Sequence, residues 1–265
     1  MHHHAHSYTV ISIDIVNSSE GGSLRHTRLL VGLHKAVHAS VADCPLGEKW
    51  VLRRDGDSMT IAVPPAVSKG EVLGEFPHRL DRELRRFNAE RTPQAQLRIR
   101  MAVAHGDVVV DGDQLLGGDG LVEAARVRDI TPLRLAMDAA PDAYIGLVLP
   151  DAVYRTSVRD GDPALMPHAY RQVRASSKRY EGTAWIRLIG VDPPRDGDGG
   201  PREAVPAEPG SVPRDGDAAP SAGDAAPSAG DAAPSAGDTY NTSIDTANGP
   251  LAIGRHARAG TSDGS

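Results

Sequence analysis

The sequence lacks features that define several common classes of protein. Its single cysteine, Cys44, excludes an internal disulfide bond and a thiolate zinc cluster, and is typical of a reducing compartment. No apolar run approaches the length that spans a bilayer, and the first residues lack the hydrophobic stretch of a signal peptide. We therefore expect a cytoplasmic protein that does not enter a membrane.

An excess of positive charge is also missing. Residues 193–265 hold 5 Lys and Arg against 11 Asp and Glu, which leaves 24 of each sign in residues 1–192. The net charge of −6 therefore lies in the C-terminal part of the chain. Because a neutral body lacks the basic surface that binds duplex phosphates, we expect no nucleic acid partner.

Aromatic residues are scarce, at 4% of the chain, whereas 28 Gly and 20 Pro indicate a segment that does not fold. That segment is residues 191–239, rich in Pro, Gly, Asp and Ala, in which the sequence DAAPSAG occurs three times from Asp217. A proline and a glycine in every repeat exclude a coiled coil. We expect a disordered, flexible linker.

Before the linker, strand-like and helix-like segments alternate. Period-two and β-branched patterns predict strands, and apolar residues at helical spacing predict helices. We expect Pro77 to kink the second helix or delay its start, and residues 105–107 to break a strand. The interleaved order, with an Asp-Gly hairpin turn, predicts an α/β (α+β sandwich) fold with a mixed, mainly antiparallel sheet flanked by helices. The expected strands are residues 8–16, 50–54, 59–63, 97–104, 108–110, 144–149, 170–173 and 184–189, and the expected helices are 24–41, 71–90, 122–127 and one that starts at Pro132.

Acidic residues mark the ends of the first strands. Asp14 ends a hydrophobic strand, and Asp57 lies in the turn of the following hairpin, so the two carboxylates converge if those strands are neighbours. Carboxylates in such a pair suit Mg²⁺ or Mn²⁺ carrying a phosphate substrate. The small polar residues Asn17, Ser18 and Ser19 follow, and their backbone N–H groups suit phosphate oxygens. The simpler alternative is that Asp14 caps a helix and residues 55–57 form only a turn.

Four segments in order resemble the catalytic domain of the class III nucleotidyl (adenylate/guanylate) cyclases. They are residues 12–16 (SIDIV), 53–57 (RRDGD), 100–108 (RMAVAHGDV) and 118–126 (GDGLVEAAR). The resemblance covers residues 7–190 and is greatest to the short cyclase-homology domains of actinobacterial signalling and conflict proteins. It implies a ferredoxin-like cyclase core.

The resemblance also implies roles for individual residues. Asp14 and Asp57, with the Ile15 carbonyl, match the ligands of two Mg²⁺ or Mn²⁺ ions per site, and Arg126 matches the arginine that steadies charge on the transferred phosphate. A basic residue for the terminal phosphates is expected at Lys178 or Arg179.

Three positions depart from the family pattern. Val122 stands where the family has a ribose-orienting asparagine, Arg53 where it has a purine-recognising lysine, and Leu115 where it has the polar partner of that lysine. Leucine cannot hydrogen-bond a base edge, so selectivity for adenine is not supported. Arg53 can bind a carbonyl-bearing base or a phosphate, which leaves guanine, uracil or a lost substrate open.

In the family, sites form between two domains, so the resemblance implies a homodimer that contains two composite sites. The predicted function is a metal-dependent nucleotidyl cyclase that converts a nucleoside triphosphate to a cyclic nucleotide and pyrophosphate in bacterial signalling or defence. The alternative is a degenerate cyclase-homology domain that binds nucleotide or acts as an adaptor.

The C-terminal residues 240–260 regain apolar and β-favouring character after the linker. They weakly resemble bacterial amyloid-like signalling motifs that recruit an effector protein carrying the same motif. A disordered end of the chain is the alternative interpretation.

Overall fold

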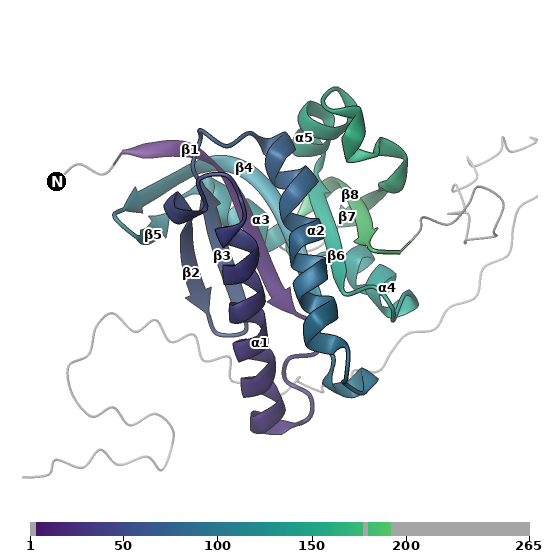
Figure 1. Ribbon diagram of the computed structural model, residues 1–265. Coiled ribbons are helices and arrows are strands. Elements are labelled where there is room, and N and C mark those ends of the chain that lie inside the picture. Colours follow the sequence, from purple (N-terminus) through teal and green to yellow (C-terminus); the bar gives the residue numbers. More distant parts are fainter. Residues whose placement is uncertain (1–3, 177–179, 192–265) are drawn as a thin grey trace, which may run out of the picture. The chain divides into compact units, whose positions relative to one another are not determined.

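A computed structural model of the chain describes residues 4–176 and 180–191 (Figure 1). Within these residues eight strands form one sheet in the order β2-β3-β1-β4-β6-β8-β7, with β5 paired to β4. The β4–β6 pair is parallel and the other pairs are antiparallel, which confirms the expected mixed, mainly antiparallel sheet. The strands are β1 (Ala5–Ile15), β2 (Val51–Asp55), β3 (Ser58–Val63), β4 (Ile99–Asp111), β5 (Gln114–Gly117), β6 (Ile145–Pro150), β7 (Arg171–Ser176) and β8 (Glu181–Ile189).

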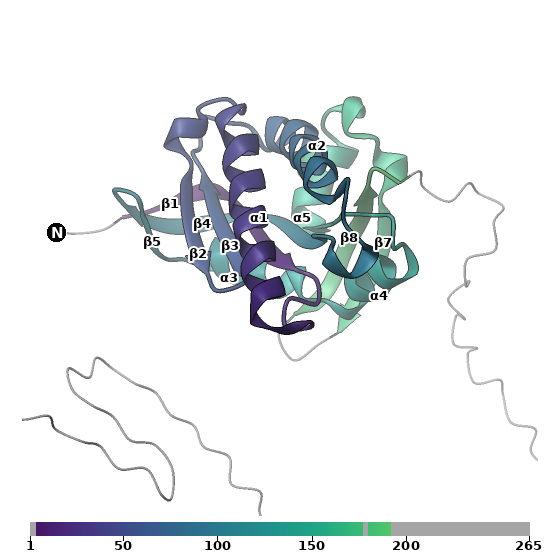
Figure 2. The ribbon, with the colours of Figure 1, turned by 60° about the horizontal axis from the view of Figure 1, so that its bottom comes forward.

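Helices cover both faces of the sheet (Figures 1 and 2). On one face lie α1 (Gly22–Ala42) and α2 (Lys69–Asn88), and on the other lie α3 (Asp119–Arg128) and α4 (Thr131–Ala139). The short α5 (Asp151–Tyr154) continues into a π-helical turn (Arg155–Arg159). Single 3-10 turns occupy Gly47–Lys49, Pro93–Ala95, Pro163–Leu165 and Pro167–Ala169.

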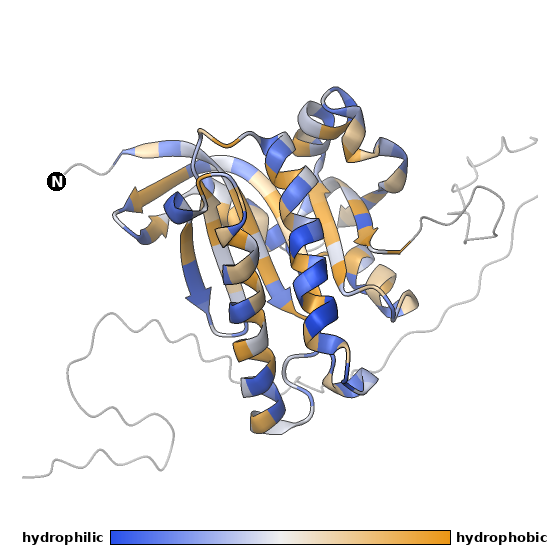
Figure 3. Ribbon diagram, viewed as in Figure 1, coloured by the Kyte–Doolittle hydropathy of each residue, from blue (hydrophilic) through white to orange (hydrophobic). Residues whose placement is uncertain are grey.

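The alternation of side chains along β1 decides which residues reach each face. Ile11, Ile13 and Ile15 pack in the core with α1 and α2, whereas Val10 packs with α3 on the opposite face. Because successive strand residues point to opposite faces, Ser12 and Asp14 share the α3 and α4 face. Figure 3 shows the resulting contrast between the apolar strands and the hydrophilic outer side of α2.

Two expectations about where a strand is interrupted and where a helix starts are wrong. The predicted strands 97–104 and 108–110 are one strand, β4, because Gly106 does not interrupt pairing with β1. A Cβ at Gly106 would lie 3.0 Å from the backbone of Gly120, so this glycine admits the close approach of α3. For the second helix we expected Pro77 either to kink the helix or to delay its start, and the delayed start is wrong. A capping box between Ser68 and Glu71 starts α2 ahead of Pro77, which lies inside the helix.

Sequence reasoning missed β5 and α5, which are short and carry little periodic pattern. The linker from residue 192 onward, the C-terminal segment 240–260, and both Lys178 and Arg179 lie outside the described residues. No helix of the described residues combines the length and the apolar character needed to cross a membrane.

Candidate active site

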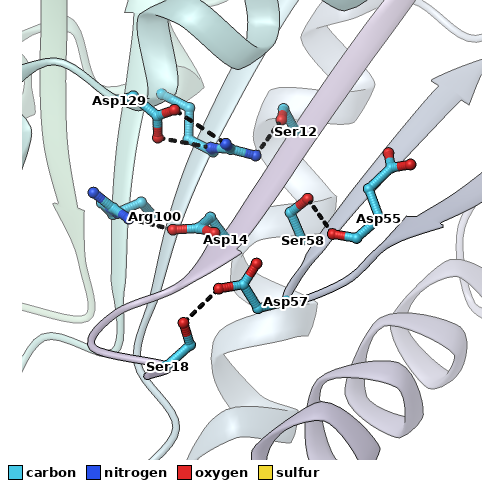
Figure 4. Close-up of polar contacts among 9 residues, drawn as sticks. Ser12, Asp14, Ser18, Asp55, Asp57, Ser58, Arg100 and Asp129 are labelled. Carbon is cyan, nitrogen blue, oxygen red and sulfur yellow. Dashed lines mark hydrogen bonds and ion pairs between the residues drawn. The ribbon is translucent and has the colours of Figure 1, made fainter. Parts of the chain in front are cut away.

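The β1–β3 pair brings the two predicted metal-binding aspartates together. Asp14 pairs with Ser58, so Asp57, the last residue of the hairpin turn, lies beside the end of β1. The Ile15 amide donates a hydrogen bond to the Asp57 carbonyl at 3.3 Å. The turn is tight, with Gly56 at φ 60°, as the Asp-Gly pattern predicts. Two residues far apart in the sequence thus lie near each other, with the Asp14 carboxylate directed to Arg100 and that of Asp57 to Ser18 (Figure 4).

The loop after β1 closes over this pair. Ser18 is buried and its hydroxyl donates to the Asp57 carboxylate. Asn17 has a left-handed φ of 53°, a conformation that asparagine tolerates better than most residues. The Arg25 guanidinium, at the start of α1, donates to the Asn17 and Glu20 carbonyls at 2.9 and 2.8 Å. The loop is therefore held in place by α1.

Sequence reasoning missed two arginines that line the same cavity as these carboxylates. Arg100, opposite Asp14 in the β1–β4 register, forms an ion pair with the Asp14 carboxylate. Arg128, at the end of α3, donates to the Ser12 hydroxyl at 2.9 Å and pairs with Asp129 at 3.1 Å. For Arg100, the antiparallel register of β1 and β4 was the signal that could have placed it opposite Asp14. For Arg128 the sequence offered none, because its position depends on how α3 crosses the sheet.

The charges of this cluster act on Asp14 in opposite directions. Burial raises the pKa of Asp14 above its ordinary value, and the nearby negative charge of Asp57 raises it further. The positive charges of Arg100 and Arg128 act against this rise. The Asp14 carboxylate is therefore poorly hydrated and surrounded by charges of both signs.

A cavity of about 380 Å³ opens at this end of the sheet. It collects all the predicted residues of the first strand, loop and hairpin turn, together with residues of β4, α3 and α4. Its lining is Asp14, Ile15, Val16, Asn17, Ser18, Ser19, Asp57, Arg100, Arg128, Asp129, Arg134, Met137 and Asp138. The expected metal-binding and phosphate-binding loop residues therefore share one cavity.

The other predicted residues do not line this cavity. Arg126 is exposed on α3, and Val122, one helical turn earlier, is 44% exposed. Arg53 on β2 pairs with Asp55 at 2.9 Å and donates to the Leu115 carbonyl at 3.1 Å. The two expected base-recognition positions, Arg53 and Leu115, are therefore in contact with each other, outside the cavity that Asp14 and Asp57 line.

The donor set of the cavity fits a hard divalent cation. Asp14 and Asp57 each use Oδ2 in the contacts above, and Oδ1 of each accepts no hydrogen bond from the described residues. Residues 4–176 and 180–191 contain no group of three or more His, Cys, Asp or Glu side chains that could hold a metal ion by themselves. Two carboxylates and a backbone carbonyl nevertheless suffice for Mg²⁺, which keeps several waters and takes further ligands from substrate phosphates.

Comparisons with known proteins give a structural match without a sequence match. No protein-family model matches the chain, and no curated protein matches it. An adenylate/guanylate cyclase/hydrolase from Silicibacter pomeroyi superposes with a TM-score of 0.51 at 10% identity, over 71% of this chain and 99% of that one. The protein has the fold of a nucleotidyl cyclase domain.

Two further solved structures are similar to this nucleotidyl cyclase fold. The adenylyl cyclase CyaB from P. aeruginosa has a TM-score of 0.44 at 12% identity, over 73% of this chain and 99% of that one. The guanylate cyclase domain of RhGC from Catenaria anguillulae, in complex with GTP, has a TM-score of 0.43 at 16% identity, over 69% of this chain and 96% of that one. The superposition on the Silicibacter pomeroyi protein is the one that establishes the fold.

Proposed function

We propose that this protein is a metal-dependent nucleotidyl cyclase of the class III type, which converts a nucleoside triphosphate to a cyclic nucleotide and pyrophosphate. The observation that carries the proposal is the shared cavity, in which Asp14 and Asp57 meet beside the loop of Asn17, Ser18 and Ser19. This cavity lies at the end of the first strand of a cyclase fold. Its residue types suit phosphoryl transfer, which needs positioning and charge neutralisation.

The metal-binding groups are the Asp14 and Asp57 carboxylates and the Ile15 carbonyl. Divalent ions bound there would neutralise the triphosphate and acidify the ribose 3′-hydroxyl. Arg100 adds a donor: its Nε is buried and has no hydrogen-bond partner among the described residues. An unpaired buried donor beside a cavity favours an anionic ligand, because leaving the donor unpaired costs free energy.

Arg126 acts in this proposal on a site of a second copy of the chain. Arg126 is exposed and lies outside the cavity of its own chain. It can therefore contact only a substrate that is bound in the cavity of a partner chain. The proposed assembly is a head-to-tail homodimer in which one chain gives the aspartates and the other gives Arg126. Arg53 and Leu115 would then face the base from the same chain as Arg126, with Lys178 or Arg179 on the terminal phosphates.

The test is turnover of the full chain with Mn²⁺ and each of ATP, GTP, CTP and UTP. We expect one or more of them to yield a cyclic nucleotide and an equal amount of pyrophosphate, with no product after chelation of the metal. Absence of any cyclic product from purified dimer would disprove the enzymatic function. Triphosphate binding without turnover would instead favour the non-enzymatic adaptor.

A further inference from the structure

The cyclase proposal gives no role to two arginines of the cavity, Arg128 and Arg134. Arg134 lies on α4, lines the cavity together with Asp14 and Asp57, and forms no ion pair with any residue that the structure describes. The two other arginines of the lining are already engaged, Arg100 by Asp14 and Arg128 by Asp129. Arg134 is therefore the cation of this lining whose charge is not neutralised by a direct contact.

The helix that carries Arg134 is fixed against the sheet. Arg98, just before β4, donates to the Met137, Ala140 and Ala143 carbonyls at 2.5, 2.8 and 3.0 Å, and so ties down the end of α4. Leu133 and Met137 are fully buried on the side of α4 that faces β6. A Cβ at Gly146 of β6 would lie 2.6 Å from the Met137 sulfur, so the helix packs closely against that strand. Arg134 is thus held at the edge of the cavity by a rigid element.

The balance of charge around Arg134 depends on metal. The lining contains four carboxylates, Asp14, Asp57, Asp129 and Asp138, against three arginines. Without divalent ions this lining is net negative and does not favour an anion. Ions bound by Asp14 and Asp57 would reverse that balance, and the exposed Arg134 guanidinium would then be free to form charge-assisted hydrogen bonds with phosphate oxygens.

We propose that Arg134 binds the phosphate chain of the substrate and of the pyrophosphate product, from the same chain that supplies Asp14 and Asp57. This inference rests on the proposed function, because it takes a polyphosphate as the ligand of the cavity. It makes α4 one wall of the cavity that also contains the proposed metal-binding residues. It also gives Arg134 a role in binding that is separate from the expected role of Arg126 in the transferred phosphate.

The experiment is isothermal titration of the full chain with inorganic pyrophosphate, in the presence and absence of Mn²⁺. In Mn²⁺ we expect Arg134→Gln to weaken pyrophosphate binding about tenfold and Arg134→Lys to weaken it less, because lysine keeps the charge but loses the planar fork. The control is Arg82→Gln, which removes another exposed arginine, from α2 on the opposite face of the sheet, and is expected to bind as the parent does.

Equal pyrophosphate affinity of Arg134→Gln and the parent would overturn the inference, and so would a parent that does not bind pyrophosphate. An effect of Arg134→Gln that is the same without Mn²⁺ would also overturn it, since the charge balance requires the metal. Pyrophosphate binding that depends on Arg134 in a protein that makes no cyclic nucleotide would support the inference and reject only the cyclase function.

Discussion

The cavity at the end of β1 contains one half of the expected site, and residues of α3, β2 and β5 outside it form the other. The two halves differ in how far one chain completes them. In the cavity, Asp57 contacts Ser18 and Asp14 contacts Arg100 within a single chain. Outside the cavity, Arg126 on α3 is exposed, and Arg53 on β2 is bound to its own chain through Asp55 and Leu115. The half proposed to bind metal is therefore assembled within one chain, whereas the proposed function requires a second chain for the other half.

The comparison also separates two kinds of electrostatic environment. Asp14 has 11% of its side chain exposed and Arg100 has 14%, so their charges act on each other with little screening by water. Arg53 and Asp55 are 39% and 43% exposed, and an ion pair of that kind contributes little to stability. Breaking the Arg53–Asp55 ion pair to bind a ligand therefore costs little free energy, whereas the buried Asp14–Arg100 pair stays in place in the fold.

The largest effect is expected from Asp57→Asn. The change removes one metal-binding carboxylate and keeps an oxygen that can accept from Ser18, so the hairpin stays intact. We expect Mn²⁺-dependent turnover to fall on the order of a thousandfold. The measurement is formation of cyclic nucleotide, with thermal unfolding as a check on the fold.

Asp55→Asn is the matched control, since Asp55 lies in the same hairpin but outside the cavity lining. A comparable loss in both variants would contradict a specific role of Asp57.

A somewhat smaller effect tests the division between two chains. Arg126→Ala is expected to lower turnover by about a hundredfold, because a charged donor to the transferred phosphate is lost. In an equal mixture with Asp57→Asn, half of the dimers are mixed, and each of these has one intact site of its two. We therefore expect activity to recover to about a quarter of the parent's. Assay of the mixed proteins after subunit exchange measures this, and no recovery would argue against composite sites.

The smallest effect is expected at the base-recognition end. Arg53→Gln removes the fork of donors that faces the Leu115 carbonyl, so preference among the four nucleoside triphosphates should fall about tenfold. Relative kcat/KM values for the four substrates measure the change. Pyrophosphate affinity serves as the reference and should stay as in the parent. A uniform loss for all four substrates would place Arg53 on the phosphates instead.

Much of the architecture was predictable from local patterns. The hydrophobic spacing of α1, the hairpin at Gly56 and the alternation of strands and helices are signals that a few neighbouring residues carry. Local patterns also misled. Glycine next to a histidine and an aspartate looked like a break at residues 105–107, but the space left at Gly106 serves the approach of α3 within a continuous β4.

The sequence by itself determined most of the order of the elements and placed Asp14 at a strand end and Asp57 in a tight turn. Their convergence followed only once β1 paired with β3. The tertiary structure alone decided that Arg100, Arg128 and Arg134 reach the same cavity and that Arg126 does not. Sheet register and the crossing of α3 and α4 over the sheet fix those distances. They arise from packing between residues distant in the sequence, which no local spacing encodes.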